Sequence, residues 1–196
     1  DTFFGTGSSL DLNTIDIDQL NDLRLIPGYD ANNSVREFDV ADSAQAILSA
    51  GDTILQDTGV DLITVNDGPA SVSEGVSLGA LSAEIEFDVQ GSADDVYNAI
   101  SYSSDALNEA NSVIVSGGDV TVSEADAIQD ISGYDLTLSD YDISDTAAAI
   151  LSGGDAILNV SGVDVVTVTD GPVLASDGET LTDYSANISF DIRDSA

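Results

Sequence analysis

Aspartates at matched positions are the most numerous candidates for chemistry in this sequence. The run VDLITVNDGP occupies residues 60–69, and its close relative VDVVTVTDGP occupies residues 163–172. Each is a β-branched run typical of a buried strand, and each ends in Asp-Gly-Pro, at Asp67 and Asp170. Asp caps backbone groups in turns, Gly permits a positive φ and Pro fixes the following φ, so the pattern first of all predicts a turn.

Two further pairs of aspartates precede these runs at equal distances. Calcium prefers carboxylate oxygens, and the chain contains no Cys, His or Met that would suit softer metals. We therefore predict Ca²⁺ as a cofactor, with six candidate ligands: Asp39, Asp42, Asp67, Asp142, Asp145 and Asp170. Asp42 and Asp145 have a competing role, because an aspartate in front of an apolar helical pattern also serves as an N-cap.

The overall composition excludes several classes of function. The 37 acidic residues outweigh three arginines to give a net charge of −34, which repels nucleic acid and anionic membranes. No run of about 18 apolar residues is present, so we expect no membrane insertion. Without His, Cys or Lys the usual triads, thiol nucleophiles and Schiff bases are missing, and no carboxylate pair departs from the repeat, so we predict that the chain is not an enzyme.

The sequence is internally duplicated. A shift of 103 residues aligns residues 42–69 with 145–172, with 18 identities in 28 positions. A shorter signature, an aromatic residue followed by Asp and then Val or Ile, begins at Phe38, Phe87, Tyr141 and Phe190. The 42% of hydrophobic residues lie in patterned runs that can form a core. We predict an α/β fold, a solenoid-like tandem repeat of units of about 50 residues arranged in pairs.

Each unit should contain a helix and two or three strands. Over residues 144–158 the spacing predicts a helix with Ser144 or Asp145 as its N-cap, and its apolar face contains Ile150, Leu151, Gly154 and Leu158. Strands over residues 82–89 and 185–192 alternate polar and apolar side chains, so one face of each should be packed and the other solvated.

Near the N-terminus, LDLNTIDIDQLND (10–22) has some of the spacing of an EF-hand. It fails as one, because Ile15 stands at the fifth loop position and Asp16 replaces the glycine that the sharp turn requires. The same residues predict a strand followed by a helix that begins at Asp16 or Asp18.

The duplication predicts two domains. Residues 1–89 form a first repeat pair with an atypical N-terminal part, and residues 90–196 form a second. The last unit stops where the others begin a helix, so we expect the next repeat or the next subunit to complete it. Joining Ala196 to Asp1 gives FDIRDSA followed by DTFFGTG, which resembles the internal FDVQGSADDVY.

The stretches YDISDTAAAILSGGDAIL…VDVVTVTDG and VTVSEADAIQDISGYDLTLSDYDI resemble the repeats of giant secreted bacterial cell-surface proteins. These are proteins of S-layer and RTX-secreted type from cyanobacteria and proteobacteria, with SDTAAxL…VTVTDG repeats. The resemblance is strongest over residues 113–172, good over 38–76 and weak over 1–27, and the GGxGxDxUx nonapeptides of RTX calcium rolls are missing. It implies an extracellular, cell-surface location and structural or adhesive work.

We therefore predict an extracellular structural protein that assembles with itself, as a subunit of a surface layer, filament or matrix stabilised by calcium. The alternative is a calcium-dependent adhesin segment that recognises a glycan or another surface, for which DDVYNAISYSS, within the divergent residues 90–118, is the candidate region. An acidic protein adapted to a salty environment is a third reading, which the tandem repeat disfavours.

Overall fold

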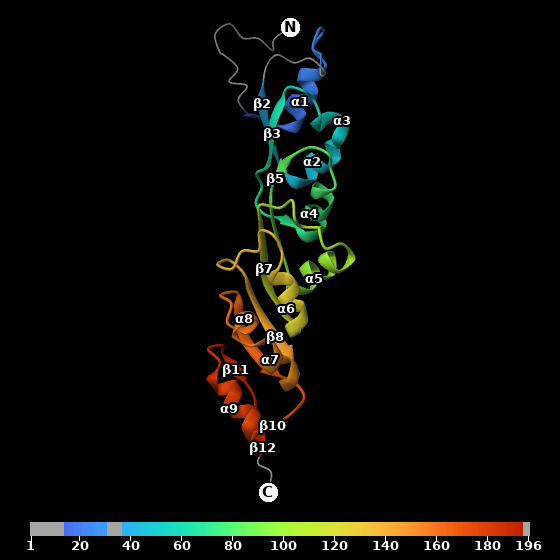
Figure 1. Cartoon of the computed structure of the whole chain (residues 1–196). Coiled ribbons are helices and arrows are strands. Elements are labelled where there is room, and N and C mark those ends of the chain that lie inside the picture. The colour runs from blue at the N-terminus through green and yellow to red at the C-terminus, as the bar shows by residue number, and fades with distance from the viewer. Residues whose placement is uncertain (1–13, 31–36, 194–196) are drawn as a thin grey trace. The chain divides into compact units, whose positions relative to one another are not determined.

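The computed structural model describes residues 14–30 and 37–193, and its helices and parallel strands confirm the α/β class (Figure 1). Its contacts divide the chain into two compact units. The first comprises Asp1–Gly68 and Ala80–Phe87, and the second comprises Pro69–Gly79 and Asp88–Ala196. Expectations about residues 1–13, and about the junction of the two chain ends, lie outside the described residues.

The first unit contains a four-stranded parallel sheet with the order β1-β2-β3-β5. Its strands are β1 (Thr14–Ile15), β2 (Phe38–Asp42), β3 (Val60–Val65) and β5 (Ile85–Glu86), and its helices are α1 (Ile17–Arg24), α2 (Ala44–Ala50) and α3 (Asp52–Leu55). Asp16 caps α1 directly after β1, so the predicted strand and helix at this point are confirmed.

The second unit contains a six-stranded parallel sheet with the order β11-β9-β8-β7-β6-β4 and a separate parallel pair, β10-β12. Its strands are β4 (Ala70–Ser71), β6 (Asp88–Gly91), β7 (Ser112–Val120), β8 (Asp140–Asp145), β9 (Val163–Val168), β10 (Val173–Leu174), β11 (Ile188–Ser189) and β12 (Ile192–Arg193). Its helices are α4 (Val72–Gly79), α5 (Ala93–Tyr102), α6 (Val122–Gln129), α7 (Ala147–Gly153), α8 (Asp155–Leu158) and α9 (Ala175–Asp183).

Local structure recurs at the spacing of the duplicated sequence. Within the first unit Val40 pairs with Ile63, and within the second unit Ile143 pairs with Val166, after the same one-residue register shift. The side chains of these four residues are buried almost completely. Each such side chain contributes about 1.5–3 kcal/mol when it is removed from water, as an upper estimate. The solenoid-like stacking of units stays a prediction.

The helix expected over residues 144–158 is two short helices. Thr146 is the N-cap of α7, so the prediction of Ser144 or Asp145 was wrong, because both residues belong to β8. Gly154 has a φ of +63°, a left-handed conformation that ends α7 and opens α8. Ile150 and Leu158 are buried as expected.

The alternation of polar and apolar side chains was predicted over residues 82–89 and 185–192. It holds fully in only one of these two copies. In residues 85–90 every odd position is buried and every even position is exposed. In the other copy Ile188 and Phe190 are half-buried and Ile192 is exposed. The two copies therefore differ in what covers the same apolar face.

A buried carboxylate distinguishes the first unit from the second. The Asp57 side chain is 0% exposed, and its Oδ2 accepts a hydrogen bond from the Tyr29 hydroxyl at 2.7 Å. The backbone N–H of Gly59 donates to Oδ1 at 3.1 Å, and Arg24 Nε lies 4.0 Å from Oδ2. These donors compensate for the lost hydration of the carboxylate.

The corresponding positions of the second unit hold different residues. Val160 stands at the position of Asp57, and Gln129, which replaces Arg24, donates to the Tyr141 hydroxyl at 2.8 Å. Tyr134 corresponds to Tyr29, but among the described residues its buried hydroxyl has no hydrogen-bond partner. Burial raises the pKa of Tyr134 far above its usual range.

We expect Tyr29→Phe to weaken the first unit by about 1.5–3 kcal/mol, because it removes a hydrogen bond to a buried charge. Tyr134→Phe is the matched control, and it should cost nothing or stabilise slightly, because the hydroxyl it removes is unpaired. Amide hydrogen exchange in β2 and β8 reports the two units separately. Equal losses from both substitutions would contradict this account.

Candidate functional site at the strand ends

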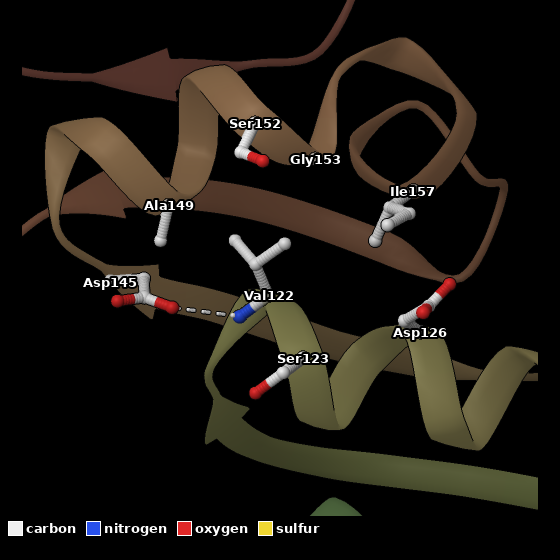
Figure 2. A pocket seen from close by; sticks show the side chains of 8 residues that line it. All are labelled: Val122, Ser123, Asp126, Asp145, Ala149, Ser152, Gly153 and Ile157. Carbon is white, nitrogen blue, oxygen red and sulfur yellow. Dashed lines mark hydrogen bonds between the residues drawn. The ribbon is translucent and has the colours of Figure 1, made fainter.

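Asp145 joins the end of a strand to the beginning of a helix. Its Oδ2 accepts a hydrogen bond from the backbone N–H of Val122, the first residue of α6, at 3.0 Å (Figure 2). Its Oδ1 accepts one from the N–H of Thr146 at 2.7 Å. Asp42 does the same in the first unit, with Ile17 at 3.0 Å and Ser43 at 2.7 Å. The negative charge also complements the positive end of the helix dipole.

Asp67 and Asp170, in the Asp-Gly-Pro corners, follow the same rule. Asp67 Oδ1 accepts the N–H of Ala44, the first residue of α2, at 3.2 Å. Asp170 Oδ1 accepts the N–H of Ala147, the first residue of α7, at 2.9 Å. The glycines that follow them have φ values of +109° and +95°, so the predicted turn is confirmed.

Four residues, the strand-end aspartates, thus share one role: Asp42, Asp67, Asp145 and Asp170. Each lies at or just after the end of a strand, and each satisfies the first amide of the helix that follows the neighbouring strand. Asp42 and Asp145 thus cap a different helix from the one predicted, since their partners are α1 and α6 rather than the helices that follow them in the chain. The hydroxyl residue directly after each of them, Ser43 or Thr146, was the available signal for the true N-cap.

The two remaining predicted ligands lie within strands. Asp142 Oδ1 accepts the N–H of Val165 at 3.0 Å, at the point where the register between β8 and β9 shifts. It therefore satisfies an amide beside an irregularity in the ladder. Asp39 is half-buried on β2, where it pairs in register with Thr14.

The structure does not gather the six predicted ligands into one coordination shell. Asp39 and Asp42 lie three residues apart on one strand, as do Asp142 and Asp145, so the members of each pair point to opposite faces. In residues 14–30 and 37–193 no group of three or more carboxylates converges as a metal site would. A closed calcium site in a single copy is not supported by this geometry, and calcium binding stays a prediction.

An open hollow of about 380 Å³ lies beside Asp145, between α6 and the α7–α8 pair (Figure 2). Gly153 contributes to it, because a Cβ there would lie 2.7 Å from Val122 Cγ1. The hollow is lined by Val122, Ser123, Asp126, Asp145, Ala149, Ser152, Gly153 and Ile157. Its lining offers carboxylate and hydroxyl oxygens beside the apolar side chains of Val122, Ala149 and Ile157.

Two carboxylates outside these positions, Glu74 and Asp135, have a lowered pKa, and at Glu74 the largest cause is the hydrogen bond from the Ser71 hydroxyl. Asp135 Oδ1 accepts hydrogen bonds from the Thr137 hydroxyl at 2.7 Å, the Thr137 N–H at 2.8 Å and the Leu138 N–H at 3.1 Å. The Thr137 hydroxyl is the largest cause that holds the pKa of Asp135 below its usual value, followed by the Thr137 N–H. This turn follows Tyr134 and leads towards β8.

Comparisons with protein-family models, curated proteins and solved structures found no significant match. Among the described helices none has the length and apolar character needed to cross a bilayer. The interpretation of the strand-end aspartates therefore depends on their own geometry.

Replacing Asp145 by Ala should destabilise the second unit by about 1–2 kcal/mol, the usual cost of losing a helix cap. Asp164→Ala removes the same charge from an exposed position on β9 and should change stability by less than about 0.5 kcal/mol. Denaturant unfolding monitored by hydrogen exchange in α6 measures both. If Asp164→Ala costs as much as Asp145→Ala, charge rather than the hydrogen bond to Val122 is responsible.

Thr137→Val should raise the pKa of Asp135 towards its ordinary value, because the hydroxyl donor to the carboxylate is lost. In the native chain the lowered pKa contributes stability above the pKa of the unfolded state, and this contribution disappears as the pH falls through the folded pKa. Titration of the Asp135 carboxyl by NMR measures the change. An unchanged titration would show that donors other than the Thr137 hydroxyl set the pKa of Asp135.

Proposed function

We propose that this chain is an extracellular, non-enzymatic structural protein that associates with copies of itself into a surface layer, filament or matrix. The observation that carries the proposal is that one arrangement, an aspartate at a strand end that accepts the first amide of a helix, occurs in both copies of the repeat. The strand-end aspartates at positions 42 and 67 recur at 145 and 170 with the same acceptor roles and the same strand register. In many linear repeat proteins each repeat interacts mainly with its neighbours, and such proteins extend by adding repeats. Here the side chain of one repeat accepts a backbone amide of the repeat before it.

We include in this proposal a tandem, solenoid-like arrangement of units of about 50 residues in pairs. The parallel pairing of consecutive strands supports it, since β7, β8 and β9 are neighbours both in the chain and in the sheet. The resemblance of the repeats to secreted bacterial surface proteins supports an extracellular, cell-surface location.

The net charge of −34 sets the conditions for such an assembly. Copies that approach closely repel one another unless ions screen or bridge their carboxylates. Since the strand-end aspartates accept backbone N–H groups, we assign calcium a role between copies. There it would bridge carboxylates on exposed strand positions such as Asp61, Asp88 and Asp164.

Electron microscopy of the chain with calcium and with chelator tests this function. We expect long regular objects with millimolar calcium and their loss in chelator at low salt, because carboxylate repulsion then returns. A third sample, in chelator with high monovalent salt, separates bridging by calcium from screening. Monodisperse particles under all three conditions would contradict self-assembly, whereas regular objects in chelator at low salt would contradict only the calcium dependence.

An adhesin is the second candidate, and one observation favours it. Tyr102, the last residue of α5, is 92% exposed and lies in the stretch that departs from the repeat. An exposed aromatic ring offers an apolar face on which a sugar can stack. Monodisperse particles that attach to glycan-coated surfaces only with calcium would favour this function over assembly.

A further inference from the structure

Three aspartates in the sequence are followed directly by glycine: Asp67, Asp170 and Asp177. At such a pair the glycine nitrogen can attack the side-chain carboxyl carbon of the aspartate, because glycine has no Cβ to hinder the approach. Water leaves and a five-membered succinimide ring forms. A second water opens the ring, mainly to isoaspartate, in which the main chain runs through the former side-chain carboxyl. The rearrangement needs no reactant other than water.

Two of the three pairs lie in the exposed Asp-Gly-Pro corners. A Cβ placed on Gly68 or on Gly171 would meet no heavy atom within 4 Å, so the space beside both glycines is open. Among the described residues neither glycine N–H has a hydrogen-bond acceptor. Neither neighbouring atoms nor a hydrogen bond therefore keeps these two nitrogens from the carboxyl carbon.

A single hydrogen bond holds each corner carboxylate. Asp67 Oδ1 accepts the N–H of Ala44 at 3.2 Å, and in the described part of the chain this carboxylate has no second donor. The same holds for Asp170 Oδ1 and the N–H of Ala147, at 2.9 Å. Opening one helix cap lowers the population that can react by a factor of about 5–30. The corners therefore keep much of the reactivity of an unfolded Asp-Gly pair.

The third pair is held inside a helix. Asp177 and Gly178 belong to α9, where helical φ and ψ angles keep the glycine nitrogen away from the carboxyl carbon. Gly178 is also buried, and a Cβ there would lie 3.1 Å from Ile192 Cδ1 and 3.3 Å from Phe190 Cε2. The ring can therefore close at Asp177 only after α9 has opened locally.

We propose that Asp67 and Asp170 are sites of spontaneous isomerisation to isoaspartate in the folded protein, and that the fold protects Asp177. In the first step the nitrogen of Gly68 or Gly171 bonds to the carboxyl carbon of the protonated aspartate, whose hydroxyl leaves as water with the nitrogen's proton. In the second step water adds to the main-chain carbonyl of the ring. The bond from that carbonyl to the glycine nitrogen breaks, and the nitrogen regains a proton. This inference is independent of the proposed function.

Isomerisation removes the acceptor from a helix in the same unit. The succinimide has no carboxylate, and in isoaspartate the carboxylate is attached directly to Cα, one carbon closer to the main chain. The first amide of α2 or α7 then loses its hydrogen bond. Amide exchange at Ala44 or Ala147 should become about 5–30 times faster in the modified molecules.

Incubation of the folded chain at neutral pH in water enriched in oxygen-18 tests the proposal. Each completed rearrangement incorporates one solvent oxygen, and peptide mass spectrometry with electron-transfer fragmentation locates the label and identifies isoaspartate. We expect labelled isoaspartate to form at Asp67 and Asp170 at least about ten times faster than at Asp177, because α9 must first open. Circular dichroism checks that the chain stays folded throughout.

Two controls accompany this measurement. Asp67→Glu keeps the carboxylate but would need a six-membered ring, which closes far more slowly, so label should disappear at position 67 and remain at Asp170. The same incubation in denaturant removes the protection by α9, so Asp177 should then react at a rate similar to that of Asp67 and Asp170.

Each outcome supports or overturns the proposal. Label at both corners of the folded chain, with little at Asp177, supports it. Corners that react only in denaturant overturn it, because the fold then protects them. Equal rates at all three sites of the folded chain overturn it as well, because α9 then gives no protection. Label that persists at position 67 in Asp67→Glu overturns the assignment of that site.

Discussion

The first backbone amide of a helix needs an acceptor, and for α1, α2, α6 and α7 an aspartate at the end of the neighbouring strand supplies one. The distance between the aspartate and its helix along the chain is 23 residues for Asp145 and Val122 and 25 for Asp42 and Ile17. Such a hydrogen bond can form only when the strands already lie side by side. It therefore couples helix formation to sheet formation, so that a helix is capped only when the next strand along the chain is in place.

This coupling explains which features the sequence predicted. The α/β class, the Asp-Gly-Pro turn and the helix start at Asp16 follow from local chemistry, which short patterns contain. The partner of Asp145 could not be found in this way, because it lies on a different helix. The position of the break at Gly154 could not be predicted, since two adjacent glycines do not indicate which one adopts a positive φ.

The two copies of the repeat show which residues differ between them and which are the same. The strand-end aspartates are the same in both, because an uncapped helix amide cannot be satisfied by an apolar side chain. The buried Asp57 is different: replacing a buried carboxylate by an apolar residue such as Val160 removes its need for donors as well. In the second unit the Tyr134 hydroxyl, which corresponds to the Tyr29 donor, is buried without a hydrogen-bond partner among the described residues.

The interaction on which the rest depends is the hydrogen bond from the first amide of a helix to an aspartate at the end of the neighbouring strand. The most direct measurement is amide hydrogen exchange at Val122 in the native chain and in Asp145→Ala, with Ala147 as the internal reference because Asp170 still accepts its N–H. We predict that exchange at Val122 becomes about 5–30 times faster in the variant, while Ala147 keeps its rate. An unchanged rate at Val122 would contradict this account.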